Sequence, residues 1–250
     1  MNKDLYKYIL EIADNCLILG QRLGELCGHG PSLETDIACT NLSLDLLGQV
    51  RSYYQYAAKL KGHDASEDTI AFLRTEREYV NVLLVEQPNR DFAYVMARQL
   101  LFDVYHLLFL KELQKSHDVT LAAIANKSIK EVSYHLRFSS DWVKRLGDGT
   151  EESHNRIQKA FDDLWTYTNE LFQATDTTEF MISEGIGVDN RMLREPYYEQ
   201  LEEILSEATI TIPETKYFQK GGKEGIHSEH MGYILSDLQY MQRTYPNMQW

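Results

Sequence analysis

The chain has 250 residues, of which 43% are hydrophobic, and its formal net charge at pH 7 is −13. This length and apolar content are enough for one sizeable core, so we expect a single domain over residues 1–250. The negative charge argues against a nucleic-acid partner and against an anionic membrane surface. The 14 Gly and 5 Pro are too few to separate the many short strands of a sandwich or barrel, which favours an all-α fold.

Helices are predicted along most of the chain, because apolar residues recur at three- and four-residue spacing and the breaks carry loop residues. The predicted helices cover 3–27, 33–61, 66–86, 92–115, 119–146, 151–173, 190–207 and 228–243. Ser66, Asp91 and Thr150 stand where helix N-caps are expected. This pattern predicts a ferritin-like long-helix antiparallel bundle with additional C-terminal helices. We place the bundle core at about 33–146 and a C-terminal extension at about 175–250.

Cysteine usage and the first residues of the chain indicate the compartment. Three cysteines are present without a C-x-x-C pair, which suits reduced thiols. Asp4, Glu11 and Asp14 interrupt the apolar stretch that a signal peptide would need, and no later segment is apolar for long enough to cross a bilayer. We therefore expect a cytoplasmic protein that binds no membrane.

Acidic residues on apolar helix faces are the most informative feature of the sequence. An unpaired buried carboxylate is costly and needs a proton, a cation or a metal ion beside it. One such acid falls on each of four successive predicted helices, at Asp45, Glu76, Asp103 and Glu131. Because the four acids stand in matching register on successive helices, they are expected to meet in one polar centre, and no Lys or Arg shares their faces to neutralise them.

This series of acids is similar to the ligands of a ferritin-like di-iron site, which uses a Glu from each of two helices and a Glu-x-x-His from each of the other two. Here both histidine positions hold tyrosine, at Tyr79 and Tyr134, and tyrosine is a poor ligand for ferrous iron at neutral pH. The imidazoles of His106 and His135 lie near the acids. The sequence thus predicts a vestigial di-iron centre without bound metal. Protons, a protonated histidine or one stray metal ion are all open as the contents of the vestigial centre. The alternative to a vestigial centre is a functional di-metal site.

Other chemistry is not indicated by the sequence. No G-x-S-x-G elbow, Walker loop or dinucleotide fingerprint occurs, and H-S-E-H at 227–230 lacks the spacing of a zinc-binding H-E-x-x-H helix. We interpret His227 and His230 as a helix-start feature or as interface contacts. The basic stretch 219–223 is interpreted as a flexible, solvated loop rather than as a site for phosphate groups.

Four long blocks of sequence carry a resemblance to a known family. They are DNCLILGQRLGELCGHGPSLETDIACTNLSLDLLGQVR at 14–51, LLVEQPNRDFA at 83–93, KSIKEVSYHLRFSSDWVKRLGDGT at 127–150 and GGKEGIHSEHMGYILSDLQYMQRTYP at 221–246. Through these blocks, which span nearly the whole length, the chain resembles the non-catalytic ferritin-like subunit of bacterial phenylacetyl-CoA epoxidase.

The resemblance implies a structural role without catalytic residues or a cofactor in this chain. The implied partner is a homologous di-iron catalytic subunit, which this subunit pairs with and stabilises in aerobic phenylacetate catabolism. Other subunits and a reductase that carries NADPH, flavin and iron–sulfur groups would complete the enzyme. A homodimer of the isolated chain stays open, whereas a general role in assembling unrelated partners stays open only if the resemblance is wrong.

Overall fold

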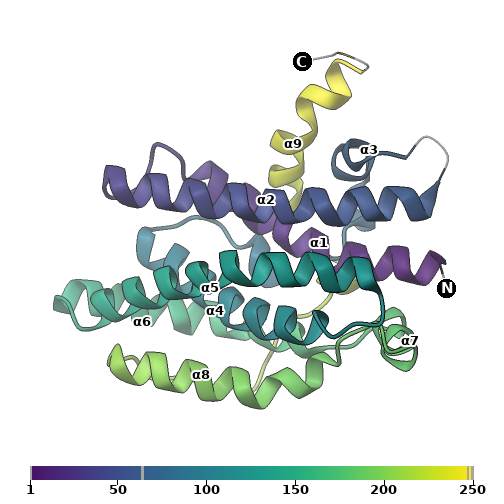
Figure 1. Cartoon of the computed structure of the whole chain (residues 1–250). Helices are drawn as coiled ribbons and strands as arrows, with labels where there is room; N and C mark the ends of the chain where they lie inside the picture. Colours follow the sequence, from purple (N-terminus) through teal and green to yellow (C-terminus); the bar gives the residue numbers. More distant parts are fainter. Residues whose placement is uncertain (1, 63–64, 247, 249–250) are drawn as a thin grey trace. The chain divides into compact units, whose positions relative to one another are not determined.

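The computed structural model describes residues 2–62, 65–246 and 248, and the described chain contains α-helices and 3-10 helices but no β-strand. The α-helices are α1 (Asn2–Glu25), α2 (Leu33–Lys61), α3 (Glu67–Phe72), α4 (Phe92–Leu113), α5 (Val119–Gly147), α6 (Glu151–Leu164), α7 (Asp176–Ser183), α8 (Arg194–Glu207) and α9 (Glu229–Thr244) (Figure 1). The 3-10 helices are η1 (Glu76–Glu78), η2 (Leu83–Glu86), η3 (Trp165–Phe172), η4 (Asn190–Leu193) and η5 (Gly222–Glu224). The all-α, ferritin-like class predicted from the sequence is confirmed.

The predicted helix starts are confirmed at the level of single hydrogen bonds. Ser66, Asp91 and Thr150 each accept a hydrogen bond on the side chain from the backbone amide three residues further on. The longest helix of the first half, α2, starts in the same way at Ser32 and ends at Gly62, whose φ of 68° is a conformation that glycine adopts without strain.

The chain divides into two compact units, and the first, unit 1, combines Met1–Pro88 with Gly221–Trp250. Within unit 1, α1 and α2 pack along each other, and the hydroxyl of Ser43 donates to the carbonyl of Gly20 at 2.7 Å. A methyl group added at Gly20 would lie 3.4 Å from the Leu47 side chain, which is at the edge of ordinary van der Waals contact. Fully buried apolar side chains form the core, among them Ile9, Ile18, Leu19, Leu42, Leu46, Tyr53 and Met231.

The prediction of one helix over 66–86 is wrong. The helix α3 covers only the beginning of this segment, and the rest is extended backbone with two short 3-10 helices. Side chains of α1 explain the difference. The amide of Val80 donates to the carboxylate of Asp14 at 3.0 Å, and the amide of Val82 donates to the side-chain oxygen of Asn15 at 2.8 Å. These partners satisfy buried backbone groups that a helix would otherwise pair internally.

Unit 2 comprises Asn89–Lys220 and is organised around α4, which contacts α5, α6 and α8. Eighteen of the 22 residues of α4 are buried. A helix with apolar residues around its whole circumference belongs in the interior of a protein, in agreement with this position. Consequently, the polar side chains that α4 carries must find their partners inside the core.

Three further helix predictions can be compared with the structure. The segment predicted as one helix over 151–173 is α6 followed by η3, and α7 lies between two predicted helices, where no helix is predicted. The C-terminal helices are confirmed, because 190–207 forms η4 and α8 and the helix expected at 228–243 is α9. The single domain over 1–250, with its core at about 33–146 and its extension from about 175, stays a prediction.

Candidate functional site

Asp103 on α4 is the fully buried acid among the predicted site residues. Its Oδ1 accepts a hydrogen bond from Nε2 of Gln99 at 2.7 Å, and its Oδ2 accepts one from Oγ of Ser139 on α5 at 2.8 Å. Both donors are uncharged. Burial therefore raises the pKa of Asp103 to about 8, although the two hydrogen bonds oppose the shift. The side chain is held mainly as a neutral carboxylic acid at neutral pH.

The Ser139 hydroxyl fits this protonated form of Asp103. The same Oγ lies 3.3 Å from the carbonyl oxygen of Leu136, to which it can donate. When the hydroxyl donates to Leu136, its oxygen can accept the proton of the Asp103 carboxyl group. The centre thus has a hydrogen-bond arrangement for the neutral acid without any cation.

His106 and His135 are both buried in the same unit. Burial, together with repulsion from a charged His135, lowers the pKa of His106 to about 3. The His106 ring packs against Phe102, with 5.1 Å between the ring centroids. His106 is therefore a neutral core imidazole one turn along α4 from Asp103.

The two remaining predicted residues of unit 2 lie nearer the surface. Glu131 on α5 is half-buried, and Tyr134 is 40% exposed. The guanidinium of Arg137 lies 5.6 Å from the centroid of the Tyr134 ring. Tyr134 thus belongs to the outer part of α5, whereas His135 on the next position points to the buried side.

Unit 1 holds the other three predicted positions. Asp45 on α2 is half-buried, and Glu76 is exposed on η1. Tyr79 is buried, but its hydroxyl donates to the carbonyl of Ala71 at 2.5 Å. The prediction that Glu76 and Tyr79 share the apolar face of a helix is wrong, because the backbone there is a 3-10 helix followed by extended chain.

The Asp103 centre does not fit a pair of iron ions. Such a pair needs several carboxylates and imidazoles with oxygen or nitrogen atoms turned toward the metal, whereas both oxygens of Asp103 are hydrogen-bonded to protein groups, Gln99 and Ser139. Across the described residues, no group of three or more His, Cys, Asp or Glu side chains could hold a metal ion. The expectation that this chain carries no metal of its own stays a prediction.

A buried ion pair in unit 1 was missed by the sequence analysis. Asp14 is fully buried on α1, and Arg74 bonds to both of its carboxylate oxygens. The hydroxyl of Tyr54 donates to the same carboxylate at 2.5 Å. Asp14 has Leu10 and Leu17 at helical spacing, so it lies on an apolar helix face in the same way as Asp103.

A second buried cluster in unit 1 joins η2 to the chain before α9. Glu86 accepts hydrogen bonds from His227 and Ser228, and both the Glu86 and the His227 side chains are fully enclosed. The helix-start interpretation of His227 is confirmed, because Ser228 is the N-cap residue of α9. The flexible-loop interpretation of 219–223 is wrong at Gly222, which is buried against the backbone of Asn81.

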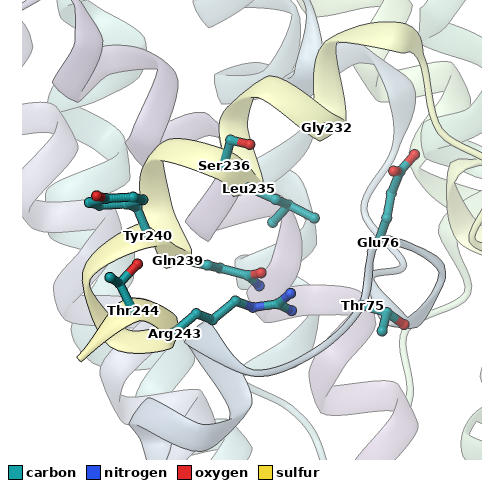
Figure 2. Close-up of a pocket in the computed structure, with 9 residues that line it drawn as sticks. All are labelled: Thr75, Glu76, Gly232, Leu235, Ser236, Gln239, Tyr240, Arg243 and Thr244. Atoms are coloured by element: carbon teal, nitrogen blue, oxygen red, sulfur yellow. The ribbon is translucent and has the colours of Figure 1, made fainter. Parts of the chain in front are cut away.

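An open pocket of about 400 Å³ lies between α9 and the segment around η1. Figure 2 shows Gln239 and Arg243 extending from α9 toward that segment. Gln239 donates to the carbonyl of Arg74 and to the Tyr79 hydroxyl, each at 2.9 Å, and Arg243 donates to the same carbonyl at 2.9 Å. The lining residues are Thr75, Glu76, Gly232, Leu235, Ser236, Gln239, Tyr240, Arg243 and Thr244. Its polar groups thus hold α9 in place.

The fold and the Asp103 centre define a ferritin-like helical protein whose buried acid is stabilised by hydrogen bonds. The chain belongs to the family of phenylacetic acid catabolic proteins, whose model matches residues 1–250. It is 48% identical over 246 residues to a protein of Escherichia coli (strain K12) that is named as a subunit of 1,2-phenylacetyl-CoA epoxidase, and the match covers 98% of this chain and 99% of that protein. In the part of the chain that the structure describes, no helix is long and apolar enough to cross a membrane.

Proposed function

We propose that the chain is the structural, non-catalytic subunit of a phenylacetyl-CoA epoxidase in aerobic phenylacetate catabolism. It pairs with a homologous di-iron catalytic subunit and stabilises it. The full-length match to the Escherichia coli epoxidase protein supports the role in such a complex. The non-catalytic assignment is supported by Asp103, whose two oxygens are both engaged by Gln99 and Ser139.

All redox chemistry then lies outside this chain. The catalytic subunit provides the di-iron centre, and a reductase with NADPH, flavin and iron–sulfur groups delivers the electrons. The buried residues of this chain keep the helices in register and exclude water from the Asp103 centre. The cytoplasm is the compartment in which CoA esters and these partners meet.

Co-expression of this chain with the proposed di-iron catalytic subunit tests the proposal. We expect the two chains to co-purify, and we expect the catalytic subunit to be less soluble and less active when it is expressed alone. Failure of the two purified chains to form a complex would contradict the structural-subunit role.

Metal analysis separates this proposal from the alternative of a functional di-metal site. The chain is purified without chelator, incubated with ferrous iron under anaerobic conditions and desalted. We expect less than one iron per chain, whereas about two irons per chain would establish the alternative.

A further inference from the structure

His227 has two ring nitrogens that both face hydrogen-bond acceptors. Nδ1 lies 2.6 Å from Oε1 of Glu86, and Nε2 lies 2.9 Å from the backbone carbonyl oxygen of Tyr79. A carboxylate and a carbonyl oxygen cannot donate, while a neutral imidazole carries only one N–H group. A neutral histidine beside an ionised Glu86 can therefore satisfy only one of the two contacts. One additional proton is needed to satisfy both.

The other partners of Glu86 place that extra proton on the histidine. Oε1 accepts a hydrogen bond from Nδ2 of Asn81 at 2.9 Å, and Oε2 accepts bonds from the amide of Ser228 at 2.8 Å and from its hydroxyl at 2.6 Å. Three donors other than His227 thus favour the ionised carboxylate. This geometry fits an imidazolium paired with a carboxylate, and both side chains are enclosed by protein.

This pair stands where the C-terminal part of unit 1 joins the rest of that unit. Ser228, which binds Glu86, is the N-cap residue of α9, so the pair sets where the helix begins. Met231, Ile234 and Leu235 then bury the apolar face of α9. Loss of the pair would leave the start of α9 without a charged anchor.

We propose that His227 and Glu86 form a proton-dependent latch that holds the start of α9 against unit 1 and releases it when the bridging proton is lost. After that loss, the ring has one N–H group for two acceptors. Either the 2.6 Å contact between Nδ1 and Oε1 or the 2.9 Å contact between Nε2 and the Tyr79 carbonyl oxygen is then left without a proton. Both outcomes leave a buried contact between two acceptors, which is costly. The latch rests on this geometry and not on the proposed role in an epoxidase.

The charged groups around the latch determine the direction of the pH dependence. Burial lowers the pKa of His227, but the hydrogen bond and charge of Glu86 on η2, the Tyr79 carbonyl and the charge of Glu76 on η1 together raise it above the ordinary value. Arg22 on α1 bonds to the backbone carbonyl of Glu86 at 2.8 Å and 3.0 Å. Because the folded-state pKa of His227 is raised, the latch is closed below about pH 6.5 and opens as the pH rises through that higher value.

Nuclear magnetic resonance of the histidine rings in the full chain tests the protonation state directly. His227 is assigned by comparison with the variant His227→Gln, and the exposed His29 serves as an internal reference. We expect both nitrogens of His227 to be protonated at about pH 6.5, where an ordinary histidine is half titrated. A neutral His227 ring at that pH would overturn the proposal.

Hydrogen exchange of peptides from α9 tests the release. After correction for the chemical exchange rate, we expect at least a tenfold loss of protection in the wild-type chain as its His227 ring loses its proton, with no such change in α8. The variant His227→Gln should show low protection at every pH, and His29→Gln should behave like the wild type. If His227→Gln does not fold, two measurements on the wild-type chain still test the proposal, namely the titration of the His227 ring and the pH dependence of α9 protection. Protection of α9 that does not follow the ring titration would contradict the latch.

Discussion

Arg74 and Asp14 form a two-point ion pair inside unit 1, with Nη1 of Arg74 2.8 Å from Oδ2 of Asp14 and Nη2 2.7 Å from Oδ1. The two side chains are 5% and 0% exposed. The guanidinium also lies 4.0 Å from the centroid of the Tyr79 ring. The pair joins α1 to the segment after α3, because Asp14 also accepts the amide of Val80.

Arg74→Met is expected to lower the free energy of unfolding by about 3–5 kcal/mol, since it leaves the Asp14 carboxylate buried without its cation. Urea denaturation measures the loss. The matched control is Arg77→Met, which removes an exposed arginine of η1 and should change stability by less than about 0.5 kcal/mol. The double variant Asp14→Leu with Arg74→Met should lose less than the sum of the two single changes, and additive losses would contradict a coupled pair.

The raised pKa of Asp103 predicts how stability depends on pH. The folded chain keeps this proton up to about pH 8, whereas an unfolded aspartate releases it near about pH 3.9. The folded state therefore binds more protons in this interval, and its contribution to stability falls as the pH rises. In the wild type, the free energy of unfolding should decrease between about pH 5 and pH 8, and Asp103→Asn should make this decrease smaller by about 1 kcal/mol or more.

Denaturation at several pH values measures this slope. Asp141→Asn is the control, because it changes an exposed aspartate on α5 by the same chemical step and should keep the wild-type slope. An unchanged slope in Asp103→Asn would show that Asp103 is already ionised in the folded chain.

Activity of the assembled epoxidase provides an independent measure of the Asp103 centre. Asp103→Asn should leave turnover within about twofold of the wild type, because the proposed role requires a neutral hydrogen-bonded side chain and no metal ligand. The complex is purified before the assay, so that the chains it contains are known. Normal assembly with strongly reduced turnover would show that this centre takes part in the chemistry.

Replacement of glycine by alanine is expected to change the stability of the chain in opposite directions at two positions. Gly225 has a φ of 73°, and an added methyl group would overlap the backbone carbonyl of Arg77. Gly225→Ala should therefore destabilise the chain by about 1–3 kcal/mol. Gly48 lies in α2 with nothing within 4 Å of an added methyl group, so Gly48→Ala should stabilise the chain by up to about 1 kcal/mol. Thermal unfolding compares the two, and equal shifts would contradict this interpretation.

Local chemistry in the sequence was sufficient for most helices and for the burial of Asp103. Ser66 and Thr150 were recognisable as caps because an N-cap depends only on neighbouring residues. Contacts between distant residues were not accessible in this way. Glu76 was misplaced because Asp14 and Asn15 bind the backbone more than sixty residues later, at Val80 and Val82.

The same limit explains why the cluster at Glu86 was missed. Glu86 and His227 are 141 positions apart, and neither belongs to a regular apolar pattern that would mark it as buried. A histidine and a glutamate at this distance in a single sequence have no periodicity in common. Their pairing follows from the return of the chain to unit 1 after residue 220.

The discontinuous make-up of unit 1 has a consequence for biosynthesis. A ribosome that has translated Met1–Pro88 must still produce all of unit 2 before the segment from Gly221 onward leaves the exit tunnel. Until then Glu86 lacks His227 and Ser228, and the surface that receives α9 is open to water or to chaperones. Unit 2 is contiguous and has no such delay, so it is the part of the nascent chain that can finish folding first.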